Sequence, residues 1–404
     1  MDRKNSSQKK AALIGAGPAG LFAADCLIRA GFEVDIYDRH ERAGGKFLLA
    51  GKSGLNITND ENPTVMAERY GVNELLFRSL LEGFSSDDLR DWLKAMDVET
   101  FRGNGGKIFP KDISPGEILL LWLDRLEKSG SFHYHGRCEW IGWKGGKPLL
   151  SQEGKDVSLN RIPLLFALGG GSWTGSKSWP DFFEAQEIGL TPFKPMNCSF
   201  RVDWSDRFNR DHWDRPVKNV ALKRGDVTRR GDLLLTKEGI EGGPVYWFSL
   251  PLREALEEEG EAVLYADLMP DLSREDLELL LTKKSRKKSL SSYLKGTMKL
   301  PPEKLSLLME FTTPEERVSP ALLAGKIKLL PLRLTGTGSL ERAISTSGGI
   351  SMDSLDEFLM IKSLPGYFVA GEMADWEAPT GGYLLQGCFA TAYRAAEGMK
   401  RFCL

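Results

Sequence analysis

The sequence predicts an α/β protein in which one parallel-sheet domain is assembled from both ends of the chain. Three observations predict this arrangement. A strand, a glycine-rich turn and a helix follow one another directly after the polar residues 1–10. Two further apolar runs, at 164–168 and 366–370, are typical of buried parallel strands that end in a glycine turn. Between these runs, short alternating segments give way to helical spacing, which indicates an inserted β-barrel-like domain and a small helical domain.

Length and composition agree with a globular protein of two or three domains. The 404 residues are 41% hydrophobic and 27% charged, and the formal net charge at pH 7 is −2. No stretch reaches the roughly 18 consecutive apolar residues that a membrane span requires. Glycines interrupt the apolar run after residue 10, which argues against a signal peptide. The scattered cysteines and histidines predict neither disulfides nor a metal site, so we expect a cytoplasmic protein without a metal.

The first forty-five residues predict a dinucleotide-binding unit of the Rossmann type. Residues 11–14 form a short apolar strand, 21–30 a helix closed by Gly31, and 32–37 a second strand. The turn between the first strand and the helix reads G-x-G-x-x-G. Its first glycine permits the tight turn, the second lets the backbone approach a pyrophosphate, and the third lets helix and strand pack closely. The helix N-terminus directs N–H groups and the positive end of its dipole toward the phosphates.

An acid completes this unit. Asp38 ends the second strand, 23 positions after Gly15, where its carboxylate can accept hydrogen bonds from ribose hydroxyls. Strand, glycines, helix, strand and acid therefore appear in the order that dinucleotide binding requires. The residues that this unit contributes to the predicted cofactor site are Gly15, Ala16, Gly17, Pro18, Ala19, Gly20, Asp38 and Arg39.

Later segments distinguish FAD from NAD as the predicted cofactor. Residues 42–45, Arg-Ala-Gly-Gly, resemble a continuation that flavoproteins of the glutathione-reductase type carry after the second strand. The segment 164–170 resembles another segment of that superfamily, with Leu168 in place of the usual threonine. Residues 366–372 resemble a third, in which an acid, here Glu372, meets the ribityl or pyrophosphate part of the flavin. These resemblances imply a Rossmann-like FAD-binding domain of the glutathione-reductase type.

Glycines before the last predicted helix belong to the same domain. Residues 380–383 read Thr-Gly-Gly-Tyr and begin a helix over 384–400, whose N-terminus would face the flavin ring or its phosphates. No second G-x-G-x-x-G precedes a helix, so we expect no separate nicotinamide domain. The prediction is non-covalent FAD, with NAD(P)H as a candidate transient electron donor. The FAD domain is predicted to comprise residues 1–190 and 335–404.

Three regions together resemble one family, the BaiN-like (YhiN-type) bacterial flavoproteins, described as NAD(P)/FAD-dependent oxidoreductases. They are residues 45–59, residues 167–176, and residues 348–351 with 371–386. The chain departs from many members at 54–55, where Gly-Leu replaces Arg-Cys, and so resembles a divergent subgroup. Members include an aminoacetone oxidase and proteins described as bile-acid enoyl reductases. The resemblance therefore implies the cofactor more firmly than the reaction.

The resemblance also implies further site residues. The backbone near Cys138 would pass the adenine. The cofactor-binding residues that it adds are Gly45, Lys46, Asn56, Thr58, Cys138, Ala167, Gly169, Gly170, Gly371, Glu372, Gly381, Gly382 and Tyr383. The candidates to face the flavin ring are Asn56, Thr58, Glu377, Tyr383 and Gln386. Glu377 or Tyr383 could move a proton as a catalytic residue, and packing or backbone bonding is the alternative for each. Arg342 could hold a carboxylate, with a surface salt bridge as the alternative.

The middle of the chain is expected to hold the inserted domains. A β domain is predicted over 191–270 and 326–334, and a helical insert over 271–325. The insert contains the basic run 283–288, Lys-Lys-Ser-Arg-Lys-Lys, which could touch nucleic acid or an anionic surface. We favour a solvated helix end, because the overall charge is slightly negative and no aromatic residues interleave with the run.

Three functions are compatible with the sequence. The favoured one is an FAD-dependent oxidoreductase in which NAD(P)H reduces the flavin and a small organic substrate is then reduced. The second is an FAD oxidase that passes electrons from a small amine to oxygen. The third is a non-enzymatic flavin-binding or redox-sensing protein. We expect a small-molecule substrate, and neither a nucleic-acid partner nor a membrane.

Overall fold

The first and last parts of the chain fold together around one parallel sheet. Its strand order is β20–β10–β1–β2–β6, and each neighbouring pair is parallel. Residues 11–14 of β1 and all of β10 and β20 are buried, as expected for strands covered on both faces. The strands are β1 (Lys10–Ile14), β2 (Glu33–Tyr37), β6 (Phe132–His135), β10 (Leu164–Phe166) and β20 (Tyr367–Val369).

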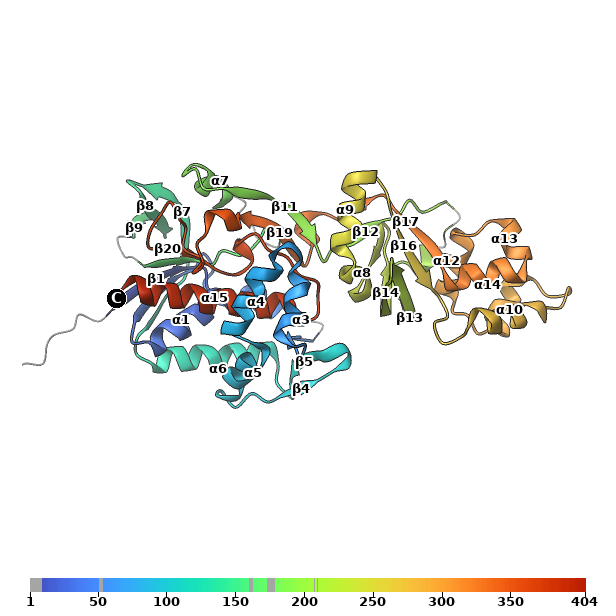
Figure 1. The fold of residues 1–404 in the computed structure, drawn as a ribbon, viewed down its shortest axis with the longest axis horizontal. Helices are drawn as coiled ribbons and strands as arrows, with labels where there is room; N and C mark the ends of the chain where they lie inside the picture. Colours follow the sequence, from blue (N-terminus) through green and yellow to red (C-terminus); the bar gives the residue numbers. More distant parts are fainter. Residues whose placement is uncertain (1–8, 51–53, 160–162, 173–178, 207, 209) are drawn as a thin grey trace, which may run out of the picture. The chain divides into compact units, whose positions relative to one another are not determined.

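The chain divides into two units (Figure 1). One comprises Met1–Lys194 and Ser345–Leu404, and the other comprises Pro195–Ile344. The computed structural model describes residues 9–404 except 51–53, 160–162, 173–178, 207 and 209. Two parts of the family resemblance, residues 51–53 and 173–176, therefore lie outside the described residues.

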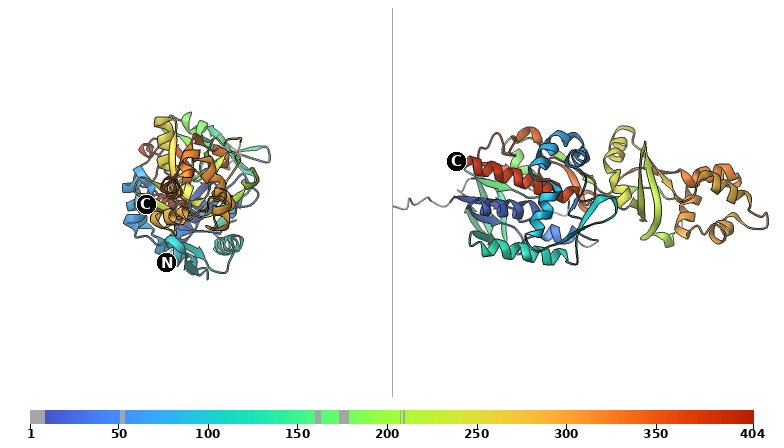
Figure 2. Two further views of the ribbon diagram at one scale, coloured as in Figure 1. Left: turned by 90° about the vertical axis from the view of Figure 1, so that its right-hand side faces the viewer. Right: turned by 60° about the horizontal axis from the view of Figure 1, so that its bottom comes forward.

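Helices cover one face of the parallel sheet. α1 (Pro18–Arg29) packs against α15 (Tyr383–Phe402) and against α6 (Pro115–Lys128). Figures 1 and 2 show α15, in red, running beside α1, in dark blue. α6 begins with a capping box, since the Ser114 hydroxyl accepts from the N–H of Glu117 and the Glu117 carboxylate accepts from the N–H of Ser114.

A three-stranded antiparallel meander lies on the opposite face. It consists of β7 (Cys138–Lys144), β8 (Lys147–Gln152) and β9 (Lys155–Ser158). The Trp143 ring lies 5.6 Å from that of Tyr367 in β20. The next residue of β20, Phe368, lies against α15 beside Gly398. Because successive side chains of a strand point to opposite faces, the meander and α15 cover different faces of the sheet.

Short elements surround the ends of the parallel strands. β3, β5 and β4 form a small antiparallel sheet, and β11 pairs with β19. These elements are α2 (Gly45–Ala50), β3 (Thr58–Asn59), α3 (Pro63–Ala67), η2 (Glu68–Asn73), α4 (Glu74–Gly83), α5 (Ser86–Lys94), β4 (Thr100–Arg102), η3 (Asn104–Gly106), β5 (Lys107–Pro110), α7 (Trp179–Glu184), β11 (Leu190–Met196), β19 (Ser345–Ile350), η6 (Met352–Ser354) and η7 (Gly371–Met373).

The second unit is a seven-stranded antiparallel sheet with helices packed against it. The strand order is β17–β16–β13–β14–β15–β12–β18. Its strands are β12 (Phe200–Arg201), β13 (Arg215–Arg224), β14 (Val227–Leu235), β15 (Gly239–Glu241), β16 (Ala262–Asp267), β17 (Leu330–Leu334) and β18 (Gly336–Thr337). Its helices are η4 (Arg210–His212), α8 (Gly243–Trp247), α9 (Ser249–Glu259), α10 (Arg274–Thr282), α11 (Leu290–Gly296), α12 (Pro302–Glu310), α13 (Pro314–Val318), α14 (Pro320–Lys328) and η5 (Leu340–Arg342).

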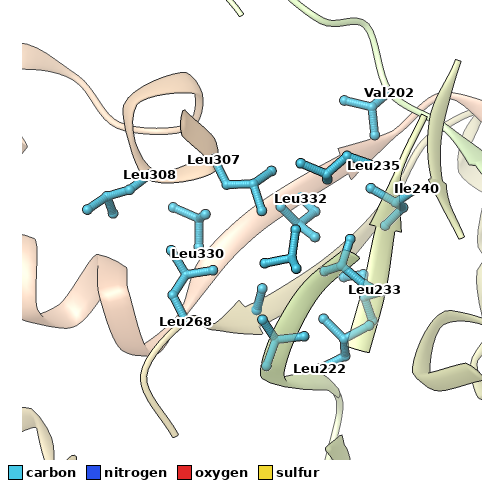
Figure 3. Close-up of a cluster of buried hydrophobic side chains, with 14 of the residues drawn as sticks. Val202, Leu222, Leu233, Leu235, Ile240, Leu268, Leu307, Leu308, Leu330 and Leu332 are labelled. Carbon is cyan, nitrogen blue, oxygen red and sulfur yellow. The ribbon is translucent and has the colours of Figure 1, made fainter. Parts of the chain in front are cut away.

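One apolar core joins the sheet and the helices of this second unit. Side chains of β13, β14 and β17 meet those of α12 in a continuous buried cluster (Figure 3). Leu307 and Leu308 supply the α12 side, and Leu330 and Leu332 belong to β17. The helical segment therefore buries its apolar face against the sheet, which holds the helices in fixed positions within this unit.

A buried carboxylate ties three helices of the first unit together. Asp25 on α1 is only 2% exposed. It accepts a hydrogen bond from Trp92 Nε1 of α5 at 2.9 Å and pairs with Arg125 of α6 at 3.3 Å. Arg29, one turn further along α1, lies 3.2 Å away. Removal of this carboxylate would leave a buried indole N–H and a guanidinium without their acceptor.

We predict that Asp25→Ala lowers the free energy of unfolding by about 2–3 kcal/mol, because it removes hydrogen bonds to a buried charged acceptor. Urea denaturation followed by circular dichroism measures the change. Asp91→Ala is the matched control, since Asp91 is exposed on α5, and it should shift stability by less than ~0.5 kcal/mol. Equal transition midpoints for the two variants would contradict the role of Asp25.

Candidate cofactor site

The turn after β1 brings three backbone segments into contact. Gly15 has a φ of +104°, and a Cβ there would lie 2.3 Å from the carbonyl oxygen of Ala167, just after β10. A Cβ on Gly20 would lie 1.9 Å from the carbonyl oxygen of Gly15. Only glycine fits at either position, because no side chain tolerates such contacts with backbone. The start of α1 is thereby set against the end of β10.

The N-terminus of α1 is open. Gly17 is its N-cap, no side chain caps the helix, and Pro18 follows as its first residue. A Cβ on Gly17 would meet no atom within 4 Å, in contrast to Gly15 and Gly20. A pyrophosphate fits this space, because it needs a close backbone approach and carries the negative charge that a helix N-terminus favours.

Asp38 fixes the turn from the other side. Its carboxylate accepts hydrogen bonds from the N–H of Ala16 at 2.7 Å and of His40 at 2.8 Å. The remaining lone pairs of the carboxylate can accept ribose hydroxyls. The carbonyl of Asp38 accepts from the N–H of Cys138 at 2.8 Å, so β7 begins at this end of the site. Burial raises the pKa of the Cys138 thiol to about 11, which favours an inert thiol. Arg39 is half-buried and donates to His40.

An ion pair joins two predicted segments that are distant in sequence. Lys46 Nζ, in α2, lies 2.5 Å from a carboxylate oxygen of Glu372 in η7, and 3.5 Å from Ser172 Oγ.

Glycines of the predicted site lie beside this pair in the sequence. Gly371 has a φ of +76° and donates its N–H to Thr391 of α15. A Cβ on Gly170 would lie 2.4 Å from Thr346 Oγ1. The same hydroxyl oxygen accepts a hydrogen bond from the N–H of Gly171 at 2.9 Å. Gly169 is also left-handed, and a Cβ on it or on Gly45 would meet no atom within 4 Å. Hydroxyl and phosphate groups of FAD are ligands that the Lys46–Glu372 pair can hold.

Asn56 carries a polar atom without a partner. Its Oδ1 is buried, and no hydrogen-bond donor reaches it from the described residues. An unsatisfied buried acceptor costs roughly 1–3 kcal/mol, so such an atom indicates a place where a bound group supplies the donor. The flavin ring carries an N–H group of this kind. The open Gly17 and the orphaned Asn56 acceptor both fit FAD.

The side chains of Thr58 and Gln386, which the sequence offered as candidates to face the flavin ring, are hydrogen-bonded to one another. The Thr58 hydroxyl donates to Gln386 Oε1 at 2.7 Å, and Gln386 Nε2 donates to the carbonyl of Phe84 at 2.9 Å. Both side chains are fully buried. Gly382, at a φ of +95°, packs against the backbone of Thr58, where a Cβ would lie 2.3 Å from its carbonyl oxygen. Asn59 Nδ2 donates to the carbonyl of Gly381 at 3.2 Å. These contacts set the N-terminus of α15 beside β3.

The Tyr383 side chain lies in a charged cluster that the sequence did not predict. Its hydroxyl is hydrogen-bonded to Glu61 and Arg69, and the residue is 2% exposed. Arg69 forms a two-point pair with Glu61, at 3.0 and 2.8 Å. Burial raises the pKa of Tyr383 well above its usual value, and the Glu61 charge raises it further against the opposing effect of Arg69. The phenol therefore keeps its proton throughout the ordinary pH range.

The two other candidates from the sequence, Glu377 and Arg342, belong to different segments of the chain. Glu377 is half-buried in the loop between η7 and α15. Arg342 belongs to the second unit, where its side chain is 81% exposed and 3.9 Å from Glu238. This is the surface salt bridge that the sequence left as the alternative to a carboxylate site. Within the described part of the chain, no three His, Cys, Asp or Glu side chains gather as metal ligands would. No helix of that part has the length and apolarity to cross a membrane.

A family model settles the relationship to known proteins. The model described as HI0933-like protein, Rossmann domain, matches residues 9–398. The chain belongs to the HI0933-like family. This membership confirms the resemblance to the BaiN-like flavoproteins, a family of FAD-dependent oxidoreductases. It also confirms the predicted fold class, a Rossmann-type FAD-binding domain with inserted β and helical parts.

Two full-length relatives of this HI0933-like protein have named activities. It is 24% identical over 403 residues to the 3-dehydro-bile acid delta(4,6)-reductase of Clostridium scindens, covering 95% of this chain and 97% of the relative. It is also 24% identical over 418 residues to the ribosomal RNA dihydrouridine synthase of Escherichia coli, covering 96% and 97%. Among solved structures, 3-ketosteroid-delta4-(5alpha)-dehydrogenase from Rhodococcus jostii shares the fold at 15% identity, with a TM-score of 0.52 and 99% of each chain covered.

We predict that Gly17→Ala weakens FAD binding at least tenfold, because the added methyl group occupies the space that the pyrophosphate needs. Quenching of flavin fluorescence during titration of the apoprotein measures the dissociation constant. Gly243→Ala is the matched control, since a Cβ there also meets no atom within 4 Å but lies in α8 of the second unit. Unchanged FAD affinity in Gly17→Ala would reject the predicted pyrophosphate position.

Proposed function

We propose that the chain is an FAD-dependent reductase that delivers hydride to a carbon–carbon double bond conjugated with a carbonyl group, with NAD(P)H as the electron donor. The observation that carries the proposal is the presence together in the first unit of the open Gly17 turn, the Lys46–Glu372 pair and the orphaned Asn56 acceptor. These features fit a bound flavin. The type of reaction comes from the relatives' names, because a 3-oxo-Δ4,6 bile acid and the uracil ring each contain a double bond conjugated with a carbonyl.

When bound, FAD would accept hydride from NAD(P)H and supply hydride to the β-carbon of the substrate. One proton must then reach the α-carbon, and the chain has to provide its donor. Tyr383 is the better of the two sequence candidates, because its phenol stays protonated and is hydrogen-bonded to Glu61. Glu61 is partly exposed, so solvent can reach the carboxylate beside the phenol. Arg69 holds that carboxylate in place through two hydrogen bonds.

The first test is an anaerobic titration of the purified holoprotein with NADH and NADPH, followed by a 4-en-3-one acceptor. We expect rapid loss of the flavin absorbance with one nucleotide and its return when the acceptor is added, with a product that has gained two hydrogens. A flavin that stays oxidised with both nucleotides but forms peroxide with small amines would instead make the protein an oxidase. A flavin inert to all of these reagents would leave a non-enzymatic flavin-binding or redox-sensing protein.

We predict that Tyr383→Phe slows reoxidation of the reduced flavin by the acceptor about 100-fold or more, because it removes the proton donor. Reduction of the flavin by NAD(P)H should be unchanged, and stopped-flow absorbance separates the two half-reactions. In the unaltered protein the reoxidation rate should be flat from about pH 6 to 10, because the raised pKa keeps the phenol protonated beyond the usual tyrosine value. A loss seen in Glu377→Gln and absent from Tyr383→Phe would assign the proton to Glu377.

The uracil base of RNA is a second candidate substrate for the same chemistry. It contains a double bond conjugated with a carbonyl, as the proposed reaction requires. The specific observation that favours it is the exposed basic run of the helical segment, which a small apolar substrate would not need.

A further inference from the structure

A pocket on the surface of the first unit takes no part in the proposed flavin chemistry. Its volume is about 370 Å³. The end of η2 and α4 form one wall, and η6 and the loop after it form the other. The apolar side chains that line it are called the apolar patch below. They are Val72, Leu75, Leu76, Met352, Leu355 and Leu359.

Hydrogen bonds hold both walls of the pocket. Arg394 of α15 donates to the carbonyl of Ser79 in α4 at 2.9 Å and to the carbonyl of Glu357 in the loop at 3.1 Å. Asn73, at the end of η2, donates from Nδ2 to the carbonyl of Asp375 at 3.1 Å. Movement of one wall toward the other would break these bonds, so the pocket is a fixed feature of the unit.

The floor of the pocket has an uncommon backbone conformation. Leu359 has a φ of +60°, which few residues other than glycine adopt, and its side chain is 1% exposed. The Asp356 carboxylate accepts hydrogen bonds from the N–H groups of Phe358 and Met360 at 2.8 and 2.9 Å, which holds this turn. The loop wall therefore has its shape before any partner binds.

Two aliphatic side chains project from the rim of the pocket. Val72 is fully exposed and Leu75 is 79% exposed. Single exposed apolar side chains are common on proteins, but these two border an apolar hollow and form one continuous patch with it. A small organic ligand in the hollow would leave both projections in water. A surface that covers the whole patch has to fill the hollow and bury the projections at once.

The apolar patch has both shapes that such a contact requires. In a two-fold dimer the same surface of each copy meets the other, so a projection and a hollow on one surface can satisfy each other twice. A second copy turned through half a revolution would place Leu75 of each copy in the pocket of the other. Both projections and both hollows would then leave water together, which favours association.

Charges beside the patch are also of both signs. Asp353 and Glu357 are exposed acids on the loop wall, and Lys362 and Arg401 are exposed cations next to them. Lys362 donates to the carbonyl of Asp353 at 2.9 Å, and the Arg401 guanidinium lies 4.3 Å from the centre of the Phe358 ring. A surface with acids and cations side by side can oppose unlike charges when it meets its own copy, which an all-acidic rim could not do.

We propose that the apolar patch is the contact between two copies of this chain in a two-fold dimer, with Leu75 of each copy in the pocket of the other. The patch is smaller than the roughly 20–30 residues a side of a standard interface. The dimer is therefore a weak one that dissociates on dilution. The proposal does not depend on the flavin reaction, because it concerns residues outside the candidate cofactor site.

Sedimentation velocity of the holoprotein tests the dimer at concentrations from about 1 to 200 µM, which bracket a micromolar dissociation constant. We expect the sedimentation coefficient of the unaltered protein to rise with concentration from the monomer value toward that of the dimer. Leu75→Lys should lower the association constant at least about tenfold, because the ammonium group would lose its water in an apolar pocket. Leu120→Lys is the matched control, since Leu120 is 67% exposed on α6 outside the patch, and it should dimerise normally.

A second variant alters the hollow instead of the projection. Met352→Glu places a carboxylate in the half-buried lining of the pocket and should also be monomeric. An equal mixture of Leu75→Lys and Met352→Glu should regain the dimer. In that mixture the lysine of one copy meets the new carboxylate of the other, while the remaining leucine enters an unaltered pocket. A defect in folding could not produce this recovery, and each variant should also keep its FAD.

An unaltered protein that stays monomeric at every concentration would overturn the proposal. So would a dimer that persists in both variants, or two monomeric variants that do not associate when mixed. A monomer whose native mass spectrum shows a bound organic molecule, absent from Met352→Glu, would assign the pocket to a small ligand instead of a second copy.

Discussion

The close approach of the β1–α1 turn to the end of β10 is the contact on which the candidate site depends. Gly15 touches the backbone at Ala167, and Gly20 touches the backbone at Gly15. Any side chain at either glycine would push α1 away from the sheet. The N-terminus of α1 would move with it, and so would Ala19, against which Gly371 packs with a left-handed backbone. The position of Glu372, and through it that of Lys46, therefore depends on glycine being present at both position 15 and position 20.

The parts of the fold that were predictable from the sequence are those with local signals. Glycine spacing and the acid at Asp38 predicted β1, α1 and β2. The Glu61–Arg69 pair around Tyr383 has no such signal, because its members meet only through the folding of β3, η2 and α15. Nor could the sequence show that Gln386 bonds Thr58 instead of facing a ligand, since that depends on the buried geometry at Phe84.

The basic run 283–288 is typical, on the sequence alone, of a solvated helix end. In the structure Lys283, Arg286, Lys287 and Lys288 are exposed, as that interpretation expects. The sequence offered Glu377 and Tyr383 alike as candidate proton donors. The structure adds that burial raises the pKa of the Tyr383 phenol and that the Glu61 charge raises it further.

The division of the first unit between the two ends of the chain constrains the order of assembly during synthesis. The second unit is one continuous stretch, Pro195–Ile344, with its own core, so it can fold while the ribosome still holds the rest. The parallel sheet is incomplete until β20 is synthesised, and α1, which can pack against α6 earlier, lacks α15 until the end of the chain emerges. A nascent chain that already carries the glycine turn thus has only half of a cofactor site. Truncation anywhere before α15 would leave the apolar face of α1 exposed, so a stalled chain is a substrate for chaperones or proteases instead of a partly active enzyme.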